Sequence, residues 1–265
     1  MSIANVKQLF THYVKGLSPQ ECDRVFLKAG HGVPGDRAFA LMHGQPEEQT
    51  EAVPWKRKQH FVMQNDWPGL AGLACHYDSQ TATLAVQRAG VELLVAQTNT
   101  PAGRDRISAF FTGYLAALEP VPTARHPEHG PLQLVGNSNG TTRYPDREPV
   151  HLSLVSQASL DHLTQVAGQP IEVRRFRPNV LLEGVAAWAE MDWVGQELQL
   201  GTARIVVTAP INRCLNIDVN PQTGEPDIPL FSLLQEKLGH PQTGVLAKII
   251  TSGSVSVGDH LSGWT

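Results

Sequence analysis

Residues 197–214 read ELQLGTARIVVTAPINRC, two short runs of apolar and β-branched residues joined by a glycine turn and followed by Arg213 and Cys214. Short runs of this kind, bounded by glycine and proline, are typical of strands. The stretch therefore predicts strands over Glu197–Leu200 and Arg204–Thr208, with the second strand ending before Pro210. The cysteine follows four residues beyond this proline.

Similar runs on both sides of this stretch extend the pattern along the chain. They predict strands over Arg24–Leu27, Ala38–Met42, Thr83–Val86, Glu92–Val95, Leu152–Val155, Val180–Leu182, Gly244–Ile250 and Val255–Val257. Helical patterns cover Ala109–Leu118, Ser156–Val166 with a serine cap, and Pro229–Leu238 with a stop at Gly239. The glycine and proline of Gln97–Arg106 favour a loop there. Many short strands and few helices indicate a mainly β (α+β) fold of barrel or sandwich type.

The segment Pro120–Pro131 holds four prolines and a glycine, a composition that favours a boundary between two units. We therefore expect an N-terminal unit over residues 1–122 and a C-terminal unit over residues 123–265. Gln45–Gln59 is polar and charged, which indicates a surface segment.

Composition excludes some classes of function. A formal charge of -4 and a pI near 6.2 argue against a nucleic-acid binder, which needs a positive surface. No stretch reaches the roughly 20 apolar residues of a membrane span. Three cysteines leave one unpaired in any disulfide scheme, so reduced thiols and a cytoplasmic location are expected. The N-terminal residues show no secretory signal.

Cys214 is the residue with the clearest chemical context. The neighbouring Arg213 favours the thiolate, the form that attacks electrophiles and binds soft metals. The alternative is a buried, inert cysteine, which is the commoner fate of a free thiol. Cys22 and Cys75 lack a comparable setting, and for them the structural interpretation is favoured.

Cations beside glycine turns form a second set of candidates. Lys15 precedes Gly16, Arg37 follows Gly35-Asp36, and Arg174–Asn179 reads RRFRPN. Such groups can bind a phosphate or carboxylate. Alternatively, Arg37 pairs with Asp36 or another acid, and Arg174 and Arg175 are solvated. A zinc site in the segment His126–His129 is disfavoured, because its proline breaks the helix that such a ligand pair needs.

In their order and spacing, these pieces resemble the MOSC family, the molybdenum cofactor sulfurase C-terminal type of protein. The motifs are VHLSLVSQASL at 150–160, RFRPNV at 175–180, EMDWVG at 190–195, Arg213-Cys214 with DVNPQTG at 218–224, and GSVSVGD at 253–259. The N-terminal half contributes Lys15-Gly16, Gly35-Asp36-Arg37 and Phe61–Gln64. Two positions depart from the family pattern: Gly16 stands where serine is frequent, and Asn220 where aspartate is common.

The resemblance implies a MOSC β-barrel with a smaller N-terminal β-barrel-like domain. It also implies that Cys214 binds molybdenum or carries a persulfide sulfur. The surface expected to hold the molybdopterin and its phosphate comprises Lys15, Arg37, Ser156, Arg177, Asn179 and Arg213. A thiolate is a soft metal ligand, and cations and amides suit an anionic pterin phosphate.

The resemblance is greatest to the amidoxime-reducing branch. It implies an oxidoreductase that uses molybdenum cofactor to reduce small N-hydroxylated or related N–O substrates. The sequence ends at Thr265 without the ferredoxin-like tail of some relatives, so we expect electrons from an external redox protein. The alternative function is a persulfide sulfur carrier, served by a sulfur donor, or a cofactor-handling binding module. A third alternative is an interaction protein that retains the fold without the site.

Overall fold

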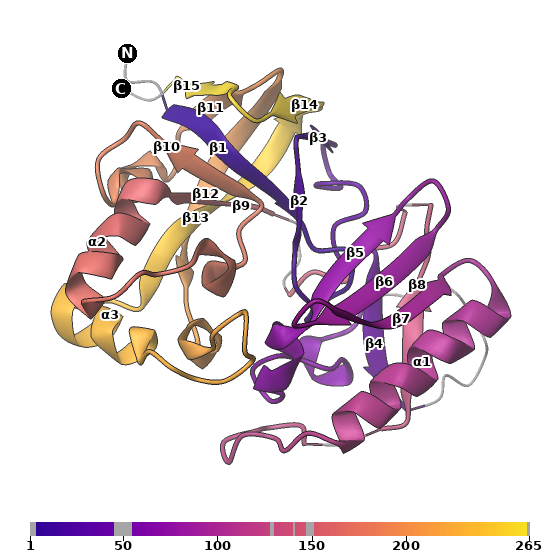
Figure 1. Cartoon of the computed structure of the whole chain (residues 1–265). Coiled ribbons are helices and arrows are strands. Elements are labelled where there is room, and N and C mark those ends of the chain that lie inside the picture. The colour runs from indigo at the N-terminus through magenta and orange to yellow at the C-terminus, as the bar shows by residue number, and fades with distance from the viewer. Residues whose placement is uncertain (1–3, 45–54, 128–129, 140, 147–150, 264–265) are drawn as a thin grey trace.

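The computed structural model describes residues 4–44, 55–127, 130–139, 141–146 and 151–263. Within these residues, the largest feature is a closed barrel of seven strands (Figure 1). In spatial order the strands are β1 (Ala4–Thr11), β10 (Val180–Glu183), β9 (Leu152–Ser156), β13 (Gln242–Thr251), β12 (Ala203–Asn212), β11 (Glu197–Leu200) and β15 (His260–Ser262). The barrel closes because β1 pairs with β10 on one side and with β15 on the other.

Buried and exposed side chains alternate along the barrel strands, and the buried ones fill the barrel interior. In β11, Leu198 and Leu200 are buried while the two residues between and before them are exposed. Strands that alternate in this way direct every second side chain inward. Closure leaves few free strand edges, and β2 (Gln20–Cys22) extends the sheet beyond β1.

The parallel pair β9 and β10 is joined by α2 (Gln157–Ala167), while the other barrel pairings are antiparallel. The Ser156 side chain accepts the N–H of Ser159 and caps α2, as the sequence predicts. Helix α3 (Leu230–Leu238) ends at Gly239, which is left-handed with φ 76°, so this prediction is also confirmed.

A second unit lies beside the barrel (Figure 1). It contains the sheet β5 (Ala74–Asp78), β6 (Thr83–Arg88) and β7 (Val91–Gln97), and the pair β4 (Phe39–His43) with β8 (Leu132–Gly136). Helix α1 (Pro101–Ala116) covers β7 and β8. Trp67 and Phe111 are among the side chains of the separate core of this unit.

Strand pairing crosses the expected boundary between residues 122 and 123. Strand β1 belongs to the barrel, and β3 (Arg24–Leu27) pairs with β14 (Gly253–Ser256). Strand β8, from the second half of the sequence, pairs with β4. The two units therefore exchange segments, which fixes how they meet.

Two local predictions are wrong. Helix α1 begins at Pro101 rather than Ala109, because the Thr100 hydroxyl accepts the N–H of Gly103 and proline suits the first helical position. Strand β12 continues to Asn212, beyond the expected stop at Pro210. The ladder register shifts on both sides of this proline, so its missing N–H is accommodated.

Short 3-10 turns complete the described chain: η1 (Lys58–His60), η2 (Pro68–Gly72), η3 (Val173–Phe176), η4 (Ala189–Trp193) and η5 (Leu215–Asp218). The expected fold class, mainly β with a few helices and built on a barrel, is confirmed. Among the helices described, none is both long and apolar enough to cross a membrane.

Candidate functional site

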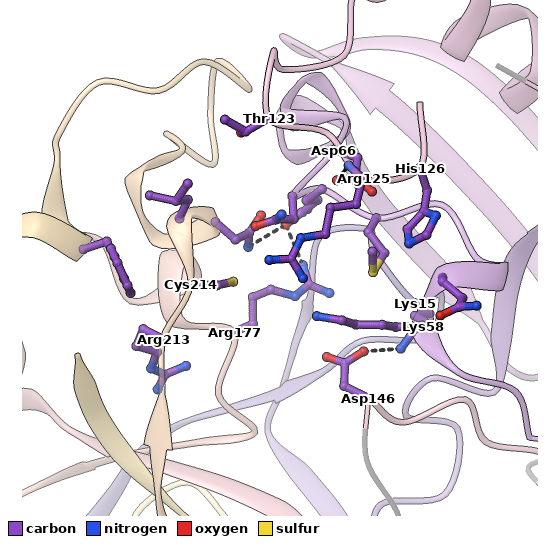
Figure 2. A pocket seen from close by; sticks show the side chains of 18 of the residues that line it. Lys15, Lys58, Asp66, Thr123, Arg125, His126, Asp146, Arg177, Arg213 and Cys214 are labelled. Atoms are coloured by element: carbon purple, nitrogen blue, oxygen red, sulfur yellow. Dashed lines mark hydrogen bonds and ion pairs between the residues drawn. The ribbon is translucent and has the colours of Figure 1, made fainter. Parts of the chain in front are cut away.

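A cavity of about 560 Å³ lies where the barrel and the second unit meet (Figure 2). Both units contribute lining residues: Lys15, Gly16, Arg37, Lys58, Gln59, Met63, Gln64, Asn65, Asp66, Thr123, Arg125, His126, Asp146, Arg177, Arg213, Cys214, Leu215, Asn216 and Phe231. Six of these carry a fixed positive charge, against two carboxylates. The cavity is therefore cationic, although the whole chain is acidic.

Cys214 lies two residues after the end of β12 and directly precedes η5, at the end of the barrel that faces the second unit. Its side chain is exposed, and Figure 2 shows the sulfur pointing into the cavity toward Arg177 and Arg125. The alternative in which Cys214 is buried is therefore wrong, whereas its reactivity stays a prediction. Burial does raise the pKa of Cys75 to about 12 and also raises that of Cys22.

The side chain of Arg213 fixes the backbone next to Cys214 through hydrogen bonds. Its Nη1 donates to the Phe176 carbonyl over 2.7 Å and its Nε to the Thr243 carbonyl over 2.9 Å. The guanidinium also lies 5.2 Å from the centre of the Phe176 ring. Burial lowers the pKa of Arg213 to about 9, against the opposing effects of Cys214 and Glu190. Arg213 lines the cavity, but its guanidinium donates its hydrogen bonds to backbone carbonyls.

Lys15 reaches the cavity from the segment after β1. Its Nζ donates to the Tyr144 carbonyl over 3.1 Å and pairs with Asp146. The Lys15 side chain is buried, whereas Asp146 is exposed. Burial lowers the pKa of Lys15, and the charge of Asp146 opposes this shift. An incoming anion can therefore share Lys15 with a carboxylate that is itself accessible to water.

Arg37 and Arg177 share an uncommon backbone conformation, with φ of 54° and 52°. Left-handed backbone at a non-glycine residue costs of the order of 1 kcal/mol and is enriched at functional sites. Arg37 Nη1 donates to Asp36 over 2.5 Å, as the pairing alternative predicts, and Arg177 Nη1 donates to Gln64 over 3.3 Å. Burial and the charge of Arg37 lower the pKa of Arg177 to about 10.

Asp36 is a fully buried carboxylate behind the cavity wall. Besides Arg37, it accepts the backbone N–H of His12 at 2.9 Å, Arg143 Nη2 at 2.7 Å and Asn179 Nδ2 at 3.1 Å. Burial would raise the pKa of Asp36, but Arg37, His12 and Arg143 outweigh this effect and hold it well below its usual range. Asp36 is therefore a fixed anion that orients Arg37.

Asn179 and Ser156 are not among the residues that line the cavity. Asn179 is buried and acts on the site through Asp36. Ser156 is fully buried at the start of α2, where its N–H donates to Glu190 over 3.2 Å. The structure thus gives both residues structural contacts, and direct cofactor contact for either stays a prediction.

Several lining residues were absent from the sequence-based candidates. Arg125 and His126 come from the segment Pro120–Pro131, which the proline content suggested to be a linker, and Lys58 comes from η1. No motif marks the two cations among them, Arg125 and Lys58. Residues 45–54 of the polar segment Gln45–Gln59 lie outside the described residues, as do Glu128 and His129. The described residues contain no group of three or more His, Cys, Asp or Glu suited to a metal.

The donor set fits a molybdopterin. Cys214 offers one soft ligand, and the surrounding cations suit a phosphate. Within the part of the chain described, the Oδ1 atoms of Asn65 and Asn216 are buried without a hydrogen-bond partner, and both residues line the cavity. Buried acceptors are rarely left unpaired, and a pterin ring carries N–H donors that could satisfy them.

Comparison with known proteins finds one domain family and several relatives. Residues 140–262 match the MOSC domain family model. The chain is 35% identical over 81 residues to mitochondrial amidoxime-reducing component 1 of Xenopus laevis, covering 31% of this chain and 22% of that protein. The corresponding protein of Mus musculus is 28% identical over 272 residues, covering 92% of this chain and 74% of that protein.

Molybdenum cofactor sulfurase of Bos taurus is 34% identical over 65 residues, which are 24% of this chain and 7% of that protein. The matched stretches thus span less than a quarter of the frog and bovine relatives. Among solved structures, the YUAD protein from Bacillus subtilis aligns over 99% of this chain and 97% of its own, with 14% identity and a TM-score of 0.47. Within this chain, the similarity to the MOSC domain family therefore covers residues 140–262.

Proposed function

We propose that this chain binds molybdenum cofactor in the cavity and reduces N-hydroxylated or related N–O compounds with electrons from an external redox protein. One observation carries the proposal: the exposed Cys214 thiol opens into a cation-lined cavity between two units. Relatives named as amidoxime-reducing components support the choice of reaction.

The residues of the cavity divide into two roles. The Cys214 sulfur is the protein ligand of the metal, and Lys15, Arg37 and Arg177 neutralise the pterin phosphate. When bound, the cofactor supplies the two-electron chemistry that removes oxygen from an N–O bond. Asp36 holds Arg37 in place, and Arg213 fixes the loop from which the thiol projects.

Elemental analysis tests the binding step. Protein from a host that makes molybdenum cofactor is expected to contain about one molybdenum atom per chain, because one thiol serves one metal. Cys214→Ser should lose both the metal and the reductase activity, whereas the matched Cys22→Ser, at a residue that does not line the cavity, should keep both. Full activity in Cys214→Ser would refute the assignment.

A second function, in which Cys214 accepts a persulfide from a sulfur donor, is supported by the exposure of this thiol and by the relative named molybdenum cofactor sulfurase. In this case the chain carries sulfur or handles cofactor transiently. Mass spectrometry distinguishes the two functions. One added sulfur atom on the Cys214 peptide, without stoichiometric molybdenum, favours the carrier.

The location and partners follow from the same proposal. Three free thiols in the described chain favour a reducing, cytoplasmic compartment. The partners would be a small-molecule substrate and a redox protein, or a sulfur donor for the second function. A formal charge of -4 disfavours nucleic acid as a partner.

A further inference from the structure

Two cations of the cavity, Lys58 and Arg125, have side chains with no hydrogen bond or ion pair to any other described residue. The remaining four cations are engaged. Lys15 pairs with Asp146, Arg37 with Asp36, Arg177 with Gln64, and Arg213 with two backbone carbonyls. Lys58 and Arg125 are therefore positive charges that the described chain leaves available to a ligand.

The backbone that carries Arg125 is anchored. Its N–H donates to Asp66 Oδ1 over 3.1 Å, and the Asp66 carbonyl accepts the N–H of Val121 over 3.0 Å. Asp66 is only 2% exposed. These contacts fix the segment to the second unit, so Arg125 extends from a defined point of the cavity wall.

Arg125 also faces the reactive atom. Figure 2 shows its guanidinium pointing into the same part of the cavity as the Cys214 sulfur, from the opposite wall. Arg125 and Lys58 are both exposed, so both lie closer to solvent than the buried Lys15. A molecule entering the cavity toward the thiol therefore passes these two charges.

We propose that Arg125 and Lys58 make this site select substrates that carry an anionic group, such as a carboxylate, beside the N–O bond. The inference rests on the proposed function. A guanidinium binds a carboxylate through two parallel hydrogen bonds, and an ammonium adds a point charge. The anion would be held by the second unit while the N–O group points at the barrel and Cys214.

The test compares two probes of similar shape, benzamidoxime and 4-carboxybenzamidoxime, by calorimetry with no reductant present. We expect the carboxylate to bind about tenfold more tightly, the gain expected from one hydrogen bond to a charged group. The double variant Arg125→Gln/Lys58→Gln should abolish this preference. Arg57→Gln removes a neighbouring exposed charge that does not line the cavity, and should retain it.

Other outcomes overturn the inference. Equal binding of the two probes excludes an anion site, and a preference that survives the double variant places the anion elsewhere. Measuring both probes on protein from hosts with and without molybdenum cofactor shows whether the two cations bind the substrate carboxylate or the cofactor phosphate. A preference that disappears on cofactor loading would mean that the two cations serve the cofactor instead. If the loaded protein reduces neither probe but keeps the preference, the proposed function fails and the anion site stands.

Discussion

The side-chain amide of Asn179 donates a hydrogen bond to Asp36 over 3.1 Å, and both residues are buried. Asn179 directly precedes β10 of the barrel, and its amide also donates to the carbonyl of Phe10 in β1. Asp36 in turn orients Arg37 in the cavity wall. The barrel and the cationic cavity are therefore coupled through one carboxylate.

Replacing Asp36 by asparagine should destabilise the protein strongly. The substitution leaves Arg37 and Arg143 without their buried counter-charge, and removal of one partner of a buried ion pair costs about 3–5 kcal/mol. Urea denaturation measures the loss in the free energy of unfolding. Asp23→Asn changes an exposed carboxyl and should cost little. A loss below 1 kcal/mol in Asp36→Asn, an order-of-magnitude threshold, would contradict the counter-ion role.

His12 should make the stability depend on pH. Burial, together with Arg177 and Arg37, lowers its pKa to about 3. The unfolded chain protonates an imidazole near its ordinary value of about 6.5, so the folded state binds fewer protons between these values. The stability that the neutral, buried His12 contributes is fully present above the pKa of the unfolded chain. It is lost as the pH falls through the window between the two pKa values, at up to about 1.4 kcal/mol per pH unit.

Urea denaturation of wild type and His12→Gln at about pH 7, above the window, and at about pH 5, inside it, measures the effect. The variant should lose less stability on acidification than the wild type. His76→Gln, at an exposed position, is the matched control. Identical pH dependence in wild type and His12→Gln would exclude a buried neutral imidazole.

Strands whose side chains alternate could be predicted from the sequence. Arg24–Leu27 and Glu197–Leu200 match β3 and β11 at both ends, since buried and exposed residues alternate in each. Strand β1 was not predicted, although it closes the barrel. It contains an exposed lysine, Lys7, and a register shift between Val6 and Gln8 that disturbs the period of two. Its partners β10 and β15 lie far away in the sequence.

The candidate site divides in the same way. Cys214, Lys15 and Arg37 stand in short motifs, and the structure brings all three into one cavity. Arg125 could not be predicted, because contacts with the distant Asp66 place it there and its own neighbours carry no motif. Local patterns identify residues near reactive groups, whereas long-range backbone contacts decide which further charges face them.

Two glycines of α1 should respond in opposite ways to alanine. In a helix interior, Gly→Ala ordinarily adds up to about 1 kcal/mol of stability. A Cβ at Gly113 would meet nothing within 4 Å, so Gly113→Ala should raise the melting temperature. A Cβ at Gly103 would lie 2.0 Å from the Gln97 carbonyl oxygen, so Gly103→Ala should lower it. Calorimetry of both variants checks this, and stabilisation by Gly103→Ala would be inconsistent with the turn that precedes α1.

Arg213→Gln should lower the free energy of unfolding, because Arg213 joins the end of β12 to η3 and β13. The Phe176 and Thr243 carbonyls would lose their guanidinium donor, at a cost of about 1–3 kcal/mol. The exposed Arg204, on the strand that precedes Arg213, provides Arg204→Gln as a control, with little expected effect on urea denaturation. Equal stability of the two variants would show that the hydrogen bonds of the Arg213 guanidinium contribute nothing to the stability of the fold.

Alkylation should distinguish the three cysteines. With iodoacetamide at neutral pH, the native protein should be modified at Cys214 first, since this thiol is exposed. Burial raises the pKa of Cys75 to about 12 and raises that of Cys22, so both remain thiols, and the thiolate is the reactive form. Peptide mass spectrometry measures the order, with urea-unfolded protein as the control in which all three react. If Cys22 or Cys75 reacts in the native protein as fast as Cys214, the thiol that opens into the cavity has no special accessibility, and the assignment of the metal ligand loses its structural basis.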